Sequence, residues 1–218
     1  FVYYQQKKYD EALNYLEQAK EKEPNLAITY QNLGNVYDEL GDYDQAIQNF
    51  EKTIELKGNM AETYNNLGIV YRKMGKLSKA LENYDLAIAT DHNYFIAYSN
   101  AGVISILKQD FEVAKEYFED ALALNPNFGN AYHGLAVVYA NEGKTDLAIQ
   151  NYEKSIAIMP QLTDNYNHLA FIYNEGGETQ KAIDILKKGI INNPENAELH
   201  TNLAIILANI GQYDQAIT

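Results

Sequence analysis

The stretch AETYNNLGIVYRKMGKLSKALENYDLAIATDHNY, residues 61–94, decides the fold of this chain. Tyr64, Leu67, Gly68 and Tyr71 fall at positions i, i+3, i+4 and i+7, which is the spacing of one face of an α-helix. Gly75 follows, and glycine most readily takes the left-handed conformation that is common at helix ends. The apolar residues from 77 to 88 repeat the same period. The stretch therefore predicts an antiparallel hairpin of two helices, at about 61–74 and 77–90.

Small residues indicate that the two helices of this hairpin pack closely. Gly68 lies on the first helix and Ala80 on the second. Two helices approach closely only where a side chain is absent or reduced to a methyl group. Because one hairpin cannot cover both of its own apolar faces, we expect it to stack on neighbours of the same kind.

The same pattern returns every 34 residues along the 218 residues of the chain. We divide the chain into a partial repeat 1–26, five full repeats 27–60, 61–94, 95–128, 129–162 and 163–196, and a partial repeat 197–218. The repeat 95–128 departs most from the pattern, with Gln109 in place of the turn glycine and Ser105 in a tyrosine column. Repetition at a fixed length predicts a single elongated array, since each repeat contacts mainly its neighbours.

All four prolines fall in one column of this repeat, just after the second helix: Pro24, Pro126, Pro160 and Pro194. Proline lacks an amide N–H and disfavours helical backbone in the residue before it. The column therefore predicts where each second helix ends.

Composition limits the classes of function. The net charge is −13, which disfavours nucleic acids and acidic membrane surfaces because both require clustered lysine and arginine. No apolar run approaches the length of a membrane span, so we expect no membrane insertion. The absence of cysteine excludes disulfides, thiolate metal sites and thiol catalysis. With no signal-peptide pattern after Phe1, we expect a cytoplasmic location.

The sequence offers no constellation that is typical of catalysis. Its histidines, His92, His133, His168 and His200, have no partner at i+3 or i+4 that would complete a metal-binding motif. The glycines fall at repeat spacing rather than in a phosphate-binding loop. We therefore expect no metal, no cofactor and no enzymatic activity.

The motif Tyr-x-x-Leu-Gly-x-x-Tyr at 64–71 and again at 30–37, with glycine, alanine, an aromatic residue and proline in fixed later columns, resembles the tetratricopeptide repeat family. The resemblance covers the entire chain, with tyrosine in place of the usual tryptophan of the first helix. It implies an all-α fold, a right-handed superhelical solenoid of helical hairpins whose first helices line a concave groove. It also implies a protein that binds peptides or partner helices rather than a catalyst.

One column of the first helices lies off the packing stripe and is mainly apolar. Exposed apolar residues aligned across repeats indicate an interaction site. The alternative is that superhelical winding buries them against neighbouring first helices. Leu107 widens the strip, and Arg72 at the groove edge either engages an acidic group of a ligand or stays solvated. The column reads Phe1, Asn35, Ile69, Val103, Val137, Phe171 and Ile205.

A second column predicts a ladder of amides in the groove. A primary amide both donates and accepts hydrogen bonds, so the ladder can pair with the backbone of an extended peptide. It is similar to the ladder that lines the repeat domain of O-linked N-acetylglucosamine transferases. The alternative is that each asparagine pairs with a carbonyl of a neighbouring helix. The column reads Asn32, Asn66, Asn100, Gly134, His168 and Asn202.

Chaperone-binding members of the family hold a C-terminal carboxylate with two asparagines and three basic residues. Asn35 and Asn66 match the asparagines, but Gln31, Ile96 and Asn100 stand at the basic positions. A carboxylate there would lose its water without a cation to replace it. We therefore reject this ligand.

We expect a scaffold that binds a peptide or helix of a partner protein. One alternative is the substrate-recruiting arm of a larger enzyme such as a glycosyltransferase, with its catalytic domain outside these residues. A second is a self-assembling structural protein. The last repeat stops before its second helix is complete and leaves Leu203, Ala204 and Leu207 uncovered, and an uncapped array tends to stack on another copy as a homo-oligomer.

Overall fold

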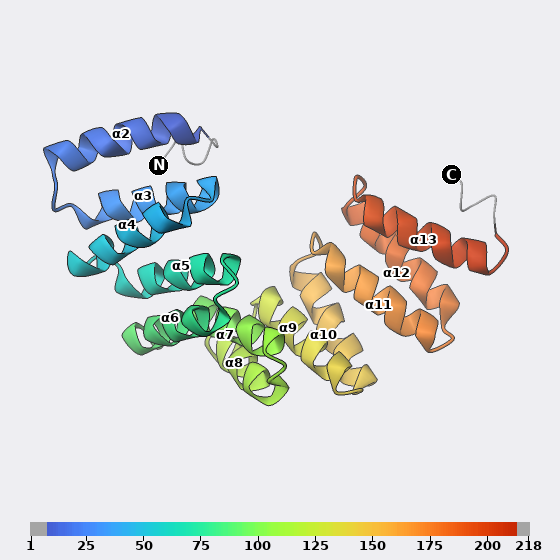
Figure 1. Cartoon of the computed structure of the whole chain (residues 1–218). Coiled ribbons are helices and arrows are strands. Elements are labelled where there is room, and N and C mark those ends of the chain that lie inside the picture. Colours follow the sequence, from blue (N-terminus) through green and yellow to red (C-terminus); the bar gives the residue numbers. More distant parts are fainter. Residues whose placement is uncertain (1–7, 213–218) are drawn as a thin grey trace. The chain divides into compact units, whose positions relative to one another are not determined.

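The computed structural model describes residues 8–212, which form twelve α-helices and no strand (Figure 1). The chain groups into two compact units, Phe1–Asp110 and Phe111–Thr218, and each is described by itself. Phe1, the first member of the predicted apolar column, lies outside the described residues. Unit 1 holds α2 (Tyr9–Lys22), α3 (Ala27–Leu40), α4 (Tyr43–Glu55), α5 (Met60–Lys73), α6 (Leu77–Thr90) and α7 (Phe95–Leu107). Unit 2 holds α8 (Phe111–Leu124), α9 (Gly129–Asn141), α10 (Thr145–Ile158), α11 (Thr163–Glu175), α12 (Thr179–Asn192) and α13 (Ala197–Asn209).

The hairpin predicted from residues 61–94 is present as α5 and α6, within one residue of the expected bounds. Gly75 ends the first helix with a φ of 74°. The amide N–H of Lys76 then donates to the Tyr71 carbonyl at 2.9 Å, which satisfies one of the carbonyls left free at the end of the helix.

The divergent repeat keeps the same turn without its glycine. Gln109 takes a φ of 62°, and the next amide, that of Asp110, donates to the Ser105 carbonyl at 2.9 Å. The hydrogen bonds of the turn thus hold a glutamine in a backbone conformation that L-residues rarely adopt.

Close approach of the paired helices explains the glycines of the first helix. A Cβ atom on Gly68 would lie 2.4 Å from Cε1 of Tyr84, and one on Gly34 would lie 2.6 Å from Cε1 of Phe50. Both rings come from the second helix of the same hairpin and are buried. Each ring therefore rests on the backbone of the first helix, where a side chain has no room.

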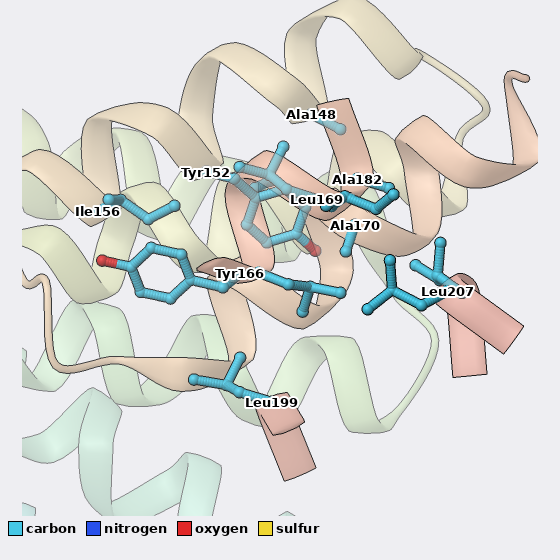
Figure 2. Packing of buried hydrophobic residues seen from close by; sticks show 13 residues of the cluster. Ala148, Tyr152, Ile156, Tyr166, Leu169, Ala170, Ala182, Leu199 and Leu207 are labelled. Carbon is cyan, nitrogen blue, oxygen red and sulfur yellow. The ribbon is translucent and has the colours of Figure 1, made fainter. Parts of the chain in front are cut away.

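Unit 2 places alanine in this column and builds a continuous core around it (Figure 2). Ala136 and Ala170 are buried in one cluster with Tyr152 and Leu186, the second-helix residues of the same two repeats. Tyr166 lies in the same cluster with no exposed surface. The core thus runs from repeat to repeat, as stacking of hairpins requires.

A hydrogen bond closes each of several inter-repeat turns. In each, a tyrosine near the start of a first helix donates its hydroxyl hydrogen to the backbone carbonyl six residues earlier, in the proline column. An aromatic residue and a proline-column residue at this fixed spacing thus define the turn. The bonds are Tyr30 to Pro24 at 2.8 Å, Tyr98 to His92 at 3.4 Å, Tyr132 to Pro126 at 3.2 Å and Tyr166 to Pro160 at 3.0 Å.

The turn residues Gln109 and Gly75 form a reciprocal pair for mutagenesis. Gln109→Gly should raise the free energy of unfolding by up to about 1 kcal/mol, because glycine removes the cost of the left-handed backbone. Gly75→Gln should lower it by about 1 kcal/mol for the same reason, since a Cβ at Gly75 would meet no other atom within 4 Å. Urea denaturation measures both changes, and shifts of the same sign in the two variants would contradict this explanation.

Candidate peptide-binding surface

Three of the four asparagines of the predicted ladder pair with the preceding first helix through their side chains. In each case one amide N–H of the later helix donates to an asparagine oxygen of the earlier helix. The amides thus bridge adjacent first helices and expose only part of their hydrogen-bonding capacity to a ligand. The pairs are Asn66 to Asn35 at 3.0 Å, Asn100 to Asn65 at 2.8 Å and Asn202 to Asn167 at 2.9 Å.

The interruption of the ladder at Gly134 has a packing cause. A Cβ atom on Gly134 would lie 2.2 Å from Cζ of Phe118, which is fully buried on α8. The next member of the column, His168, lies beside Tyr152 of α10, with 5.3 Å between ring centroids. Gly134 and His168 of this column therefore each lie beside an aromatic ring on the second helix of the preceding repeat. The ring of Phe118 leaves no room for a side chain at Gly134.

His133 of α9 and His168 of α11 lie side by side. Their rings stack with centroids 5.9 Å apart and an interplanar angle of 27°. Nδ1 of His133 lies 2.7 Å from the side-chain oxygen of Asn165, and the Asn165 amide nitrogen donates to the Ser155 hydroxyl at 2.8 Å. Because an amide oxygen only accepts hydrogen bonds, Nδ1 of His133 carries a proton.

Burial lowers the pKa of His168, and the neighbouring His133 lowers it further. The carboxylates of Asp164 and Glu198 act in the opposite direction and raise the pKa of His168. Burial also raises the pKa of the neighbouring Tyr152 hydroxyl. The net shift favours a neutral imidazole beside a neutral phenol at neutral pH.

A cavity of about 600 Å³ opens between α9, α10 and α11 in unit 2. Its wall includes Val137, His168 and Phe171, three residues that the sequence assigns to the groove, together with Tyr152 and Ile172. Asn141 and Glu175 also line it. A concave, mainly apolar site with a few polar groups is the usual form of a binding pocket.

The apolar column is accessible at several positions. The exposed fraction in this column is 66% for Phe171, 53% for Ile205 and 37% for Val103, and it is 54% for Leu107, which widens the strip. Ile69 and Val137 are half-buried. In unit 2, Phe171 and Ile205 stay exposed at the same repeat position of the successive first helices α11 and α13 and mark a candidate interaction surface.

The basic residues at the end of α5 lie beside polar groups of the neighbouring helices. Burial raises the pKa of the Tyr84 hydroxyl to about 12, and the nearby Arg72 guanidinium opposes this shift. Nζ of Lys73 lies 2.9 Å and 3.0 Å from the two carboxylate oxygens of Asp38 on α3. The ion pair of Lys73 therefore bridges α5 and α3 in unit 1.

Unit 1 has a separate cavity of about 520 Å³ where α3 meets the start of α5. It brings together the predicted residues Asn32 and Asn35 with Gln31, Asn59 and Glu62. Gln31 is buried and lies 2.7 Å from the Thr63 hydroxyl of α5. The two amides of the predicted groove thus line a pocket within one unit.

Sequence reasoning missed the buried polar partners that link adjacent first helices. A signal for them exists, because one column of the first helices is polar at every position from α3 to α13. Four of its six members make the inter-helix contacts described above. The column reads Gln31, Asn65, Ser99, His133, Asn167 and Thr201.

Two further observations concern ligand classes. Among residues 8–212, no three histidine, aspartate or glutamate side chains gather into a set that would hold a metal ion. None of the helices in this range combines the length and apolar character needed to cross a bilayer.

Family profiles of the tetratricopeptide repeat match residues 1–59, 61–94, 95–128, 117–150 and 185–218. The chain belongs to the tetratricopeptide repeat family. Membership places it among proteins that mediate protein interactions. The profiles leave residues 151–184 unmatched, and the structure shows α11 and the start of α12 within that gap. Among curated protein sequences, no match is found.

Solved tetratricopeptide repeat structures share the fold. PilW, a type IV pilus biogenesis factor, is 25% identical with a TM-score of 0.79, and the match covers 93% of this chain and 94% of PilW. MamA is 28% identical with a TM-score of 0.63, over 79% of this chain and 94% of MamA. YrrB, a tetratricopeptide repeat protein with an unusual peptide-binding site, is 23% identical with a TM-score of 0.61, over 84% and 94% of the two chains. All three confirm the all-α repeat architecture.

The histidine pair should make stability depend on pH. The pKa of His168 is lower in the folded chain than its ordinary value of 6.5, so the unfolded chain binds this proton more readily. The contribution of His168 to the free energy of unfolding should therefore be fully present above pH 6.5 and be lost as the pH drops below it. In urea denaturation at pH 7.5 and 5.5, His168→Gln should reduce this fall. His92, which lies outside the stacked pair, provides the control, and an equal effect of His92→Gln would contradict the assignment.

Proposed function

We propose that this chain is a non-catalytic scaffold that binds an extended or helical segment of a partner protein against its first helices. The observation that carries the proposal is the cavity of unit 2, where the exposed ring of Phe171 stands beside a concave, mainly apolar wall. A side chain of the partner placed there would remove the ring from water. Burial of one large apolar side chain contributes about 1.5–3 kcal/mol.

The amide pairs support a polar contribution to the same interaction. Asn202 of α13 is half-buried and uses one amide N–H on Asn167. An amide has a second N–H and an oxygen with two acceptor sites. We propose that Asn202 uses this remaining capacity on the backbone of a segment bound to unit 2, and that Asn66 and Asn100 do the same for a segment bound to unit 1.

Other predicted residues have different parts in this proposal. Ile205 extends the exposed apolar column of unit 2 beyond the cavity, and Val103 and Leu107 are exposed apolar positions of α7 in unit 1. The likeness of the amide column to that of O-linked N-acetylglucosamine transferases stays a prediction, because it rests on the sequence pattern alone. The scaffold proposal holds equally for a free-standing array and for an arm of a larger protein.

The test uses peptides that the wild-type chain selects from a random peptide library. Phe171→Ala should lower the affinity of a selected peptide at least about tenfold, because the variant loses the apolar area that binding buries. Since Phe171 is exposed in the free chain, the thermal unfolding midpoint should hardly change. Fluorescence anisotropy measures the affinity.

Ile191 provides a matched control on α12 of the same unit. It is 80% exposed on a second helix, so Ile191→Ala removes a similar exposed side chain from a different surface. We expect its affinity to equal that of the wild type. Loss of binding in Ile191→Ala with full binding in Phe171→Ala would move the site away from the first helices.

A further inference from the structure

The charges of unit 2 are segregated between its first and second helices. The first helices α9, α11 and α13 carry no lysine or arginine, and their charged residues are Asp164, Glu175 and Glu198. The six lysines of the unit lie on the second helices or in the turn before α10: Lys115, Lys144, Lys154, Lys181, Lys187 and Lys188. The carboxylates are therefore the only side chains of these three first helices that carry a full charge at pH 7 with histidine neutral.

One of the three acids lines the cavity that holds Phe171, and the other two act on the ionisation of a lining residue. Glu175 lines the cavity directly. Asp164 and Glu198 are close enough to His168, another lining residue, to act on its ionisation. All three acids are exposed, which leaves their carboxylates available to a ligand.

Cations within unit 2 do not neutralise these acids. The ion pairs found within residues 111–212 join Lys115 to Glu112, Lys144 to Glu142 and Lys181 to Glu178. Lys154 lies over the ring of Tyr132, 5.1 Å from its centroid. In the described part of this unit, none of the ion pairs involves an acid of the first helices. Their negative potential therefore acts on whatever enters the cavity.

The other charged groups near the cavity do not reverse this potential. Burial and the neighbouring His133, which stacks on it, lower the pKa of His168 and favour its neutral form. Tyr152 is a buried phenol and carries no positive charge in either ionisation state. The site thus combines an apolar floor with a rim of uncompensated negative charge.

We infer that the segment bound in this cavity is basic, with an apolar anchor side chain flanked by lysine or arginine. The anchor packs against Phe171 and Val137, and the flanking cations lie near Glu175 on one side and Asp164 on the other. Lysine and arginine suit this arrangement because their stems cover apolar surface while their charged ends remain in water. The inference rests on the proposed function, since it names the chemistry of the segment bound there.

Three synthetic peptides test the charge requirement with the full chain. They share one leucine anchor in an alanine background and carry two flanking lysines, glutamines or glutamates, with both ends blocked. Isothermal titration calorimetry should give the order lysine, glutamine, glutamate, with at least about tenfold between the first and the last. The affinity of the lysine peptide should fall as sodium chloride rises, because salt screens exposed charges. Equal affinities, or the reverse order, would overturn the inference.

Variants of Glu175 locate the effect. Glu175→Gln should weaken binding of the lysine peptide about two- to fivefold, the usual range for an exposed ion pair. Glu175→Lys should weaken it further and improve binding of the glutamate peptide. The control is Asp184→Lys, which makes the same change of net charge on α12, a second helix. An equal effect of Asp184→Lys would show that only the overall charge matters and would overturn the site assignment.

The outcomes separate this inference from the function on which it rests. If the three peptides bind equally and Phe171→Ala weakens all of them, the apolar cavity binds its segment but the basic character is wrong. If none of the three binds while library-selected peptides still depend on Phe171, the basic segment is again wrong and the scaffold stands. If no peptide of either kind depends on Phe171, both fail.

Discussion

The close contact between a second-helix ring and the backbone of its first helix sets the geometry on which the rest of this protein depends. Tyr84 lies so near Gly68 that a single added carbon would overlap the ring, and Phe50 does the same at Gly34. This contact fixes how each hairpin closes. Because the hairpin length is constant, it also fixes which residues of the first helix point away from the packing stripe.

Repeat periodicity was sufficient to predict the helices and turns. Glycine at position 75 marked the end of a helix correctly, since a positive φ is a local requirement that one residue can reveal. Gln109 shows the limit of that rule, because the same turn forms there with a residue that does not favour it. Capping hydrogen bonds and packing of the flanking helices override the local preference at that position.

Partners of the polar side chains were harder to predict than their positions. The sequence places Asn66 off the packing stripe, but its bond to Asn35 depends on the angle between adjacent first helices. No spacing within one repeat specifies that angle. Gly134 is a second example, because the ring of Phe118 on the preceding second helix leaves no space for a larger residue there. Both contacts join residues of different repeats. The sequence shows only which residue type stands at each position and not the contact that requires it.

The amide bridges have a consequence for how the hairpins assemble. A purely apolar interface between neighbouring first helices would tolerate a shift of one helical turn with little loss, because aliphatic contacts are not directional. Asn100 and Asn65 meet at 2.8 Å and Asn202 and Asn167 at 2.9 Å, so a shift would leave each donor and acceptor unpaired. These amide pairs thus specify one register between neighbouring first helices, as a buried asparagine does in a coiled coil.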